Sequence, residues 1–426
     1  MELSWMAALF GLFVAIGLIL KKFNPVYALF FGAIVGCLVG GASFADTVNI
    51  LINGTKSIMG TAIRVLAAGM LAGVMMESGA AESIARFIVD KLGEKLALFS
   101  LALATMIITG VGVFIPVAVL IVAPIALSVG KQAGWSKIAL LVALSGGGKA
   151  GNVISPNPNT IAAANGFHES LSNVMVGAFI PALFGLAMAV FLAHIIRKKG
   201  VMVQASDLED ATERELMPIG RALIAPVLAI VLLMINPIGN MLGIPALAAM
   251  NIDAMYILPF ASVLGAILMG HASKIAFYAS SGMKRVMDTV LILIGAGALA
   301  GLISTSNLSA EVVTAIQTAG ISGEFLAPIS GVLMSLAVGS TSTAVILATQ
   351  SFGDAIMSTG LTGLAAAVMV HTGATMLDAV PQGNYFHITA QSMKMSIKDR
   401  MKVMPYEALV GGIMTVVATI LYGFIW

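Results

Sequence analysis

The stretch Ser145-Gly-Gly-Gly-Lys-Ala-Gly-Asn-Val-Ile-Ser-Pro-Asn-Pro-Asn-Thr160 decides the fold, because it lies between apolar runs and cannot form an ordinary membrane helix. It combines three consecutive glycines and two prolines with amide, hydroxyl and ammonium side chains. Each unsatisfied backbone group in hydrocarbon is costly, so irregular backbone is tolerated only inside protein or beside a watery cavity. The stretch therefore predicts a membrane helix that is broken within a larger helical protein.

A second interruption lies far downstream, in Thr372-Gly-Ala-Thr-Met-Leu-Asp-Ala-Val-Pro-Gln-Gly-Asn384. It also places glycine, proline and polar side chains between apolar runs. Two broken segments at corresponding positions of two halves are the best sequence indication of a transporter's binding site. The pair therefore predicts a secondary transporter whose site lies between the two breaks.

The composition of the whole chain is that of a membrane protein. Hydrophobic residues make up 59% of the 426 residues and charged residues only 10%, with a mean hydropathy of +1.01. A soluble domain carries roughly 25% charged residues. Several apolar runs are long enough to cross a bilayer as helices: Leu3–Leu20, Pro25–Gly41, Val174–Ile196, Ile224–Met241 and Leu409–Ile425. We predict an all-α polytopic membrane protein with about 10–12 spanning helices.

Charge and motifs limit the functions further. The net charge of +2 gives no reason to expect nucleic acid as a partner, and the single cysteine, Cys37, excludes an intrachain disulfide. The sequence contains neither a His-Glu-x-x-His zinc motif nor Gly-x-Ser-x-Gly, so we expect no enzyme activity. No cofactor is expected, and H⁺ and Na⁺ are the two candidate coupling ions.

Lysine and arginine indicate the orientation of the chain, because they accumulate in cytoplasmic loops. The strongest clusters in short loops are Lys21-Lys22, Arg197-Lys198-Lys199 and Lys274 with Lys284-Arg285. The central loop Arg197–Arg221 is therefore placed in the cytoplasm. It also carries acidic residues, and we interpret it as a solvated linker between halves: Asp207, Glu209, Asp210, Glu213 and Glu215.

The two halves of the chain resemble one another in sequence. Gly69–Ser78 aligns with Gly297–Ser306 at five identical positions of ten, and Ser145–Asn157 aligns with Thr372–Asn384. The blocks recur in the same order, which indicates a repeated unit of about 150 residues. Two inverted repeats are predicted within five parts of the chain: N-terminal helices over 1–60, a first repeat over 61–196, the linker over 197–221, scaffold helices over 222–290 and a second repeat over 291–426.

Each repeat contains a further break before its broken helix. Gly110–Pro116 in the first repeat and Gly339–Thr343 in the second interrupt long apolar stretches. We interpret them as the tips of re-entrant hairpins. The ends of the broken helices would expose N–H groups with partial positive charge toward an anion, or carbonyl groups toward a cation.

At Met70–Gly93, which includes Glu77-Ser78-Gly79 and Glu82–Arg86, the chain resembles the gluconate:proton symporter family of the ion transporter superfamily. Ser396–Lys402, followed by Glu407, is similar to the C-terminal segment of that family. The resemblance implies a permease of the bacterial inner membrane, a homodimer with scaffold and transport domains, and an elevator-like movement. It also implies small organic anions as substrates, such as sugar acids or hydroxycarboxylates.

Two departures from that family's pattern leave the coupling ion open. Gluconate carriers tend to have a histidine in the proline-rich loop where this chain has Asn157 between two prolines. They also tend to have an aspartate soon after the proline of the first hairpin, where this chain has Val117–Leu120.

Lys149 and Asp378 are the main candidate site residues, because ionisable groups within membrane segments are functional hypotheses by default. Lys149 is predicted to pair with a substrate carboxylate, and Asp378 to take up a coupling proton or ligate Na⁺. The structural alternatives for Lys149 are a side chain that extends to the membrane interface or pairs with a structural carboxylate. Those for Asp378 are a helix N-cap or a salt bridge, for which Lys149 is a candidate partner.

Polar side chains of the breaks and of the second hairpin tip complete the predicted site. The substrate is predicted to contact amides and hydroxyls, some of which also cap the broken ends: Asn152, Ser155, Asn157, Asn159, Thr160, Ser340, Thr341, Ser342 and Thr343. Three further residues are predicted to serve the coupling ion beside Asp378: Thr375, Asn384 and His371. No metal site is expected.

The main alternative is a Na⁺/H⁺ antiporter of the same superfamily. Such an exchanger would be expected to have paired acidic residues in the broken segments. The sequence offers only Asp378, with Lys149 opposite.

Overall fold

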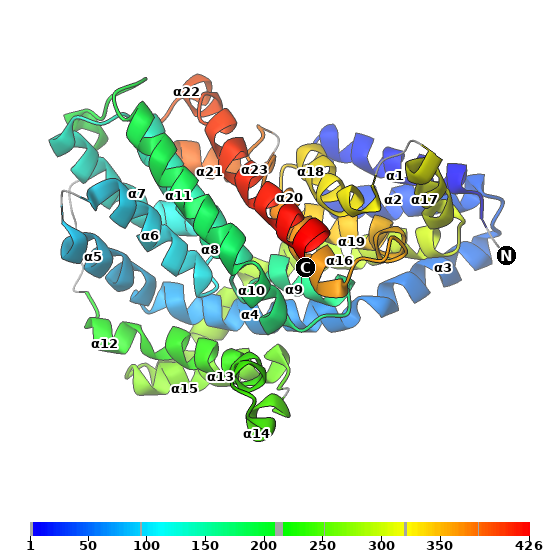
Figure 1. Ribbon diagram of the computed structural model, residues 1–426, viewed down its shortest axis with the longest axis horizontal. Coiled ribbons are helices and arrows are strands. Elements are labelled where there is room, and N and C mark those ends of the chain that lie inside the picture. The colour runs from blue at the N-terminus through cyan, green and yellow to red at the C-terminus, as the bar shows by residue number, and fades with distance from the viewer. Residues whose placement is uncertain (1–2, 94–95, 209–215, 251, 319–321, 382) are drawn as a thin grey trace.

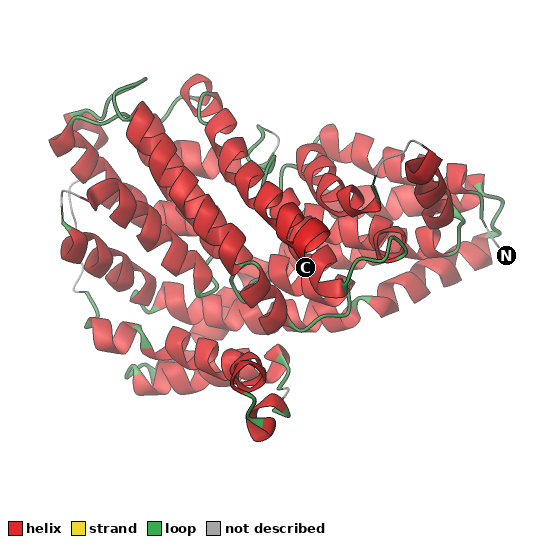
Figure 2. Cartoon of the chain, viewed as in Figure 1, coloured by secondary structure: helices red, strands yellow, loops and turns green. Residues whose placement is uncertain are grey.

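A computed structural model describes residues 3–93, 96–208, 216–250, 252–318, 322–381 and 383–426. All regular secondary-structure elements in this part of the chain are helices (Figures 1 and 2). Seven helical stretches within it are long and apolar enough to cross a membrane: Met59–Glu77, Ile115–Ala133, Lys137–Gly166, Phe179–Ile196, Ile219–Leu242, Ala272–Ser304 and Ile397–Ile425. The predicted all-α polytopic membrane class is confirmed.

Six shorter apolar helices accompany these stretches. They are α1 (Trp5–Leu20), α2 (Pro25–Val39), α6 (Ala97–Gly110), α15 (Ala254–Leu268), α18 (Leu326–Val338) and α20 (Gly363–Ala374). The long stretches contain α4 (Met59–Glu77), α7 (Ile115–Ala133), α8 (Lys137–Val153), α9 (Pro158–Gly166), α11 (Phe179–Ile196), α12 (Ile219–Ala222), α13 (Ile224–Leu242), α16 (Ile275–Ser304), α22 (Ile397–Met401) and α23 (Met404–Ile420). The remaining α-helices are α3 (Phe44–Ser57), α5 (Ala80–Leu92), α10 (Leu171–Gly177), α14 (Pro245–Ala248), α17 (Leu308–Thr318), α19 (Thr341–Met357) and α21 (Asn384–Ser392).

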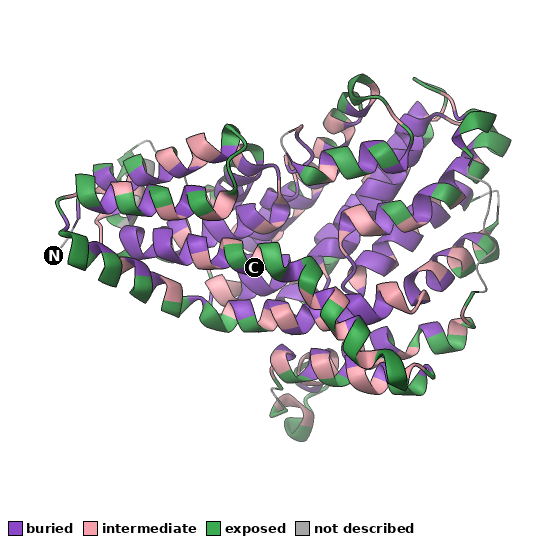
Figure 3. Cartoon of the chain, turned by 180° about the vertical axis from the view of Figure 1, so that it is seen from behind, coloured by how far each residue is buried: buried purple, intermediate pink, exposed green. Residues whose placement is uncertain are grey.

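Helix α16 organises one side of the molecule. It packs along α4, α3 and α2, while α15 packs on α4 and α13 on α15 (Figure 1). A second group of packed helices contains α6, α7, α8 and α11 together with α18, α19, α20 and α23, and α19 of this group also packs on α16. The interrupted helices lie in this second group, and α8 is buried along its whole length in the interior seen in Figure 3.

Glycines of the repeated Gly-x-x-x-Gly block form the close helix crossings. A Cβ on Gly73 of α4 would collide with backbone atoms of α16 at Tyr278 and Gly282, and one on Gly301 of α16 would collide with the carbonyl of Ile50 in α3. Small residues let membrane helices approach this closely. The aligned glycine blocks of the two halves therefore have the same role, which is to allow close helix–helix contact.

The two interrupted helices run antiparallel. The ammonium of Lys137, at the start of α8, donates to the carbonyl of Lys394, just beyond α21, at 2.8 Å. At the opposite end, Gly363 at the start of α20 packs on the carbonyl of Phe167, just beyond α9. The start of each broken helix thus meets the end of the other, as an inverted repeat requires.

The first break lies within the predicted stretch 145–160 but takes up only its second part. The glycines of Ser145–Thr160 do not break the helix, because α8 continues to Val153 and the interruption is confined to 154–157. A Cβ on Gly147 or Gly151 would meet backbone carbonyls of α6. The space beside these glycines is filled by a neighbouring helix, so the tight packing favours the helical conformation that isolated glycines would disfavour.

The interpretation of the linker as solvated is wrong for Asp207. Its carboxylate is buried and accepts a hydrogen bond from Lys137 at 2.6 Å and one from the backbone N–H of Gln204 at 2.8 Å. The loop is thereby fastened to the start of α8. Four other acidic residues of the loop lie outside the described residues: Glu209, Asp210, Glu213 and Glu215.

One predicted boundary differs from the helix bounds. The division at residues 290–291 falls inside α16, which is continuous from Ile275 to Ser304. The residues before this division and the glycine block after it are assigned to two segments from the sequence, but both belong to one helix of 30 residues.

Candidate functional site

The structure brings Lys149 and Asp378 together at the meeting point of the two interruptions. The Lys149 ammonium donates to the backbone carbonyl of Thr375 and to Oδ1 of Asp378. The hydroxyl of Thr341, from the second hairpin tip, donates to the other carboxylate oxygen at 2.5 Å. Lys149 is 0% and Asp378 3% exposed. The pair that the sequence offered as the structural alternative is therefore formed.

Local backbone geometry explains why the ammonium lies there. Helix α20 ends at Ala374, so the last carbonyl groups of this helix have no intrahelical partner and carry partial negative charge. The Thr375 carbonyl points one such acceptor at Lys149. A buried ion pair is tolerated only when additional hydrogen bonds satisfy its remaining groups, as the Thr375 and Thr341 contacts do here.

Asn157 holds the two parts of the first broken helix together. Its side-chain oxygen accepts from the backbone N–H of Asn159 at 2.8 Å and of Thr160 at 3.1 Å, which caps α9. Its amide nitrogen donates to the backbone and side-chain oxygens of Asn152, both at 2.7 Å. The predicted substrate role of Asn157 and Thr160 stays a prediction, while the capping role is visible in these contacts.

The second hairpin tip connects both breaks. Gly339 adopts a left-handed conformation (φ 66°), and Ser340 caps α19 by accepting from the N–H of Thr343 at 3.4 Å. The hydroxyl of Ser342 donates to the side-chain oxygen of Asn159 in α9. Together with the Thr341 contact to Asp378, this places the tip against both broken helices.

A polar cavity of about 540 Å³ lies between the hairpin tips and the broken helices. We call it the central cavity. Its wall includes both tips, both breaks and the α1–α2 turn: Phe114–Pro116, Ser340–Thr343, Asn152, Asn159, Asp378, Asn384, Tyr385, His387 and Lys22–Pro25. The amide nitrogen of Asn152 is buried at this wall and has no hydrogen-bond partner among the described residues. The predicted substrate role of Asn152 stays a prediction.

Other predicted residues lie elsewhere or contribute differently. Ser155 is buried, and its hydroxyl has no partner in the described part of the chain. Thr375 offers its carbonyl to Lys149, while its hydroxyl donates to Thr372. His371 is fully buried in α20, away from the central-cavity wall, with both ring nitrogens unpaired among the described residues. The coupling role of His371 stays a prediction.

Sequence reasoning missed a second buried ion pair behind the cavity wall. Arg400 donates to both oxygens of Glu407, at 2.6 and 3.1 Å, and both side chains are 0% exposed. Tyr385, which lines the central cavity, donates its hydroxyl to Glu407 at 2.8 Å. The guanidinium also lies 4.9 Å from the centre of the Phe386 ring. Arg400 lies in a run of charged residues that is typical of a solvent-exposed turn, so the surrounding sequence did not indicate that its side chain is buried.

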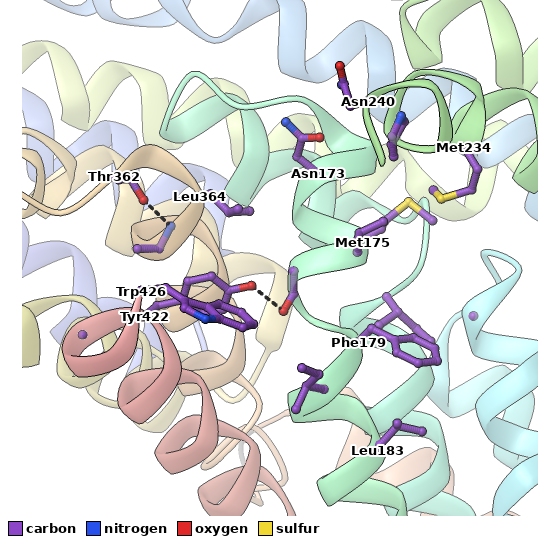
Figure 4. Close-up of a pocket in the computed structure, with 18 of the residues that line it drawn as sticks. Asn173, Met175, Phe179, Leu183, Met234, Asn240, Thr362, Leu364, Tyr422 and Trp426 are labelled. Atoms are coloured by element: carbon purple, nitrogen blue, oxygen red, sulfur yellow. Dashed lines mark hydrogen bonds between the residues drawn. The ribbon is translucent and has the colours of Figure 1, made fainter. Parts of the chain in front are cut away.

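A larger cavity of about 1320 Å³ lies near the C-terminus and α13 (Figure 4). Its wall is mainly apolar, with Met175, Phe179, Leu183 and Met234 among the labelled side chains. One hydrogen bond seen there joins the Tyr422 hydroxyl to the Gly177 carbonyl at 2.8 Å. Such a lining suits hydrocarbon rather than a hydroxylated anion, so the central cavity is the candidate solute site.

Interrupted antiparallel helices that enclose a buried ion pair and a polar cavity define a membrane transporter rather than an enzyme. The model of the GntP family permeases matches residues 1–425. The chain therefore belongs to the GntP permease family, which confirms the family expected from Met70–Gly93.

Similar proteins include both uncharacterised and named transporters. An uncharacterised transporter of Haemophilus influenzae is 45% identical over 420 residues, covering 99% of this chain and 98% of that protein. The D-serine transporter DsdX of Escherichia coli K12 is 25% identical over 77% of each chain. The high-affinity gluconate transporter of the same organism is 23% identical over 98% of each.

The fold also has a counterpart among solved structures. The YdaH transporter of Alcanivorax borkumensis, described as having an unusual topology, superimposes with a TM-score of 0.68. The match covers 90% of both chains at 16% sequence identity, so it supports the fold alone.

Proposed function

We propose that this permease is a secondary active transporter that imports a small hydroxylated organic anion together with a proton across the bacterial plasma membrane. The observation that carries this proposal is the buried Lys149–Asp378 pair at the edge of the central cavity. The gluconate and D-serine carriers among the relatives support a small carboxylate as the solute.

Exchange of partners at Lys149 would couple the anion to a cation. A solute carboxylate that takes the ammonium leaves Asp378 with only the Thr341 hydroxyl as a partner. An unpaired carboxylate in a dry interior is strongly unfavourable, and protonation relieves it. The anion and the proton therefore stabilise one another in the site, while Asn152 and Asn159 provide amides for the hydroxyl groups of the solute.

A proton fits the site better than Na⁺. A sodium ion at the second break would use the Thr375 carbonyl and the Asp378 carboxylate as ligands. The ammonium of Lys149 already occupies both oxygens. The same contacts argue against the Na⁺/H⁺ antiporter, because the only carboxylate of the two breaks is neutralised by a lysine.

Charge distribution supports a central cavity that opens toward the cytoplasm. Its wall includes Lys22 and the α1–α2 turn. The start of α8 lies beside Arg197, whose carbonyl accepts from the N–H of Ser136 at 2.8 Å. Basic residues collect on the cytoplasmic side of membrane proteins. The conformation described is then the inward-facing one.

An elevator-like movement and a homodimer remain part of the proposal. The hairpins and broken helices would move as one body, because α19 packs on α9 and α21 packs on α7, so that each half holds an element of the other. Helices α3, α4 and α16 would form the fixed part.

The pair also favours a second candidate, a zwitterionic amino acid. Lys149 and Asp378 present one cation and one anion side by side, which complements the carboxylate and ammonium of a solute such as D-serine. Such a solute would replace both partners of the ion pair at once and would need no proton to balance the site.

Counterflow in proteoliposomes tests the proposal. Vesicles loaded with unlabelled gluconate or D-serine are expected to accumulate the labelled solute, and Lys149→Ala and Asp378→Asn are expected to abolish this exchange. Exposed Lys402→Ala serves as the control, since Lys402 pairs with Asp399 at the surface. Exchange that is equal in the wild type and both pair variants would contradict the assigned site.

A further inference from the structure

A second polar cavity, of about 570 Å³, lies beside α3, α9, α16 and α19. We call it the distal cavity. Its wall includes the amides of Asn49, Asn53, Asn165 and Gln350 and the buried hydroxyl of Ser351. Ser351 is 2% exposed and its hydroxyl has no partner in the described part of the chain. The Asn165 amide already donates to the Ile161 carbonyl at 2.9 Å, so the Ser351 hydroxyl is the group of this wall that lacks a partner among the described residues.

The central and distal cavities lie at different levels along the same helices. Helix α2 separates them. The turn before α2 lines the central cavity, and Asp46, in the first turn of the next helix α3, lines the distal cavity. Helix α2 has 15 residues, which correspond to about 22 Å. The two cavities therefore face opposite sides of the membrane.

Three other helices pass from one cavity to the other in the same way. On α9, Asn159 lines the central cavity and Asn165 the distal one, six residues or about 9 Å apart. On α19, Ser342 and Ser351 are separated by about 13 Å. On α16, Ile292 lines the central cavity, whereas Ala300, Gly301 and 303–305 line the distal one.

We infer that the distal cavity is the outer vestibule of the transporter, which receives the hydroxyl-bearing solute from the side opposite the central cavity. This inference rests on the proposed function. A shift of α9 and α19 along α16 by about 9–13 Å would carry Asn159 and Ser342 to the level where the distal cavity now lies. The amides of α3 would then face the solute hydroxyls in the outward-facing state.

The rim of the distal cavity has the opposite charge from the mouth of the central one. Asp46, Asp354 and His168 line it, whereas its described wall contains no lysine or arginine. The scarcity of basic groups is typical of the outer side of a membrane protein.

The single native cysteine makes this inference directly testable. Cys37 is buried in α2 and can be replaced by alanine, which gives a background without cysteine. Single new cysteines can then be introduced and labelled one at a time. Asn53→Cys on α3 and Gln350→Cys on α19 probe the two walls of the distal cavity, and His387→Cys probes the central cavity. Each variant is exposed to a membrane-impermeant maleimide in intact cells and in inverted vesicles.

The two distal-cavity cysteines are expected to react in intact cells, and His387→Cys only in inverted vesicles. The maleimide adduct at Asn53→Cys or Gln350→Cys is expected to abolish uptake of gluconate or D-serine relative to the same unlabelled variant. Reaction of all three cysteines from the same face would overturn the inference, and so would adducts that leave uptake unchanged. The labelled face is read without any transport, so failure of the proposed function would leave this part of the result intact.

Discussion

At the scale of single residues, the account depends on where charges are buried. Lys149 and Asp378 form one buried pair and Arg400 and Glu407 another, and the second reaches the central cavity through Tyr385. Each pair is neutral as a unit, so the two pairs add no net charge to the region around the central cavity. An anion that takes Lys149 from Asp378 would leave a carboxylate without its counter-charge, and uptake of a cation would neutralise it.

The first prediction concerns the stability of the Lys149–Asp378 pair. Asp378→Asn leaves a buried ammonium without its counter-charge, and removal of one partner of a buried pair typically costs about 3–5 kcal/mol. The double variant Lys149→Met with Asp378→Asn is expected to unfold at a higher temperature than Asp378→Asn alone. Thermal unfolding in detergent measures both. A double variant less stable than either single variant would contradict the pairing.

The second prediction compares the missed pair with a surface pair on the same segment. Glu407→Gln is expected to lower stability by a few kcal/mol, because it leaves the Arg400 guanidinium unpaired in the interior. Asp399→Asn breaks the exposed contact with Lys402 and is expected to change stability by at most about 1 kcal/mol. Similar losses in both variants would show that burial does not distinguish the pairs.

Residue chemistry was only partly predictable from the sequence. Lys149 and Asp378 stood out because charges inside broken apolar segments have few structural uses. Arg400 did not, because Ser396–Lys402 has the composition of a surface turn. Only the contact with Glu407, seven residues away and on the next helix, reveals that its guanidinium points inward.

At the scale of helices, glycine has two different effects in this chain. Gly339 allows a left-handed turn at the hairpin tip, whereas Gly147 and Gly151 lie in regular helix and permit contact with α6. The sequence shows glycine in both places and does not distinguish them. The neighbour that fills the space decides whether the helix continues, and that neighbour is distant in sequence.

The third prediction tests the packing role of these glycines. The methyl group of Gly147→Ala would meet the backbone of Ala102, which cannot move aside, so a loss of about 1–3 kcal/mol is expected. Gly17→Ala in α1 is the control, because no other atom lies within 4 Å of its Cβ position. That variant is expected to be neutral or stabilising by about 0.5–1 kcal/mol. Thermal unfolding of the two variants side by side tests whether Gly147 lies at a tight helix contact. A Gly147→Ala variant as stable as the Gly17→Ala variant would contradict this packing role.

The helices that the sequence predicted best are those with long apolar runs. The run Ile224–Met241 corresponds to α13, and the run Pro25–Gly41 corresponds to α2, which ends two residues earlier. The half-helices were harder to delimit, because their ends are set by caps such as Asn157 and by tertiary contacts. The pairing of α9 with α19 and of α21 with α7 has no local signal in sequence.

At the scale of the whole molecule, inverted repeats explain why two cavities exist. The broken helices run antiparallel, and each contributes its second part to a contact with the opposite half. A structure built this way has two related arrangements, one open to each side of the membrane. A central cavity and a distal cavity are expected if the transporter alternates between these two arrangements.

The fourth prediction concerns the coupling ion, which is the central claim of the account. Addition of gluconate or D-serine to proteoliposomes that contain an internal pH indicator measures proton entry directly, with an imposed sodium gradient as the comparison. The account predicts acidification of the interior that depends on an anionic solute, is unaffected by sodium and is lost in Asp378→Asn. Uptake that requires sodium and leaves the internal pH unchanged would contradict it.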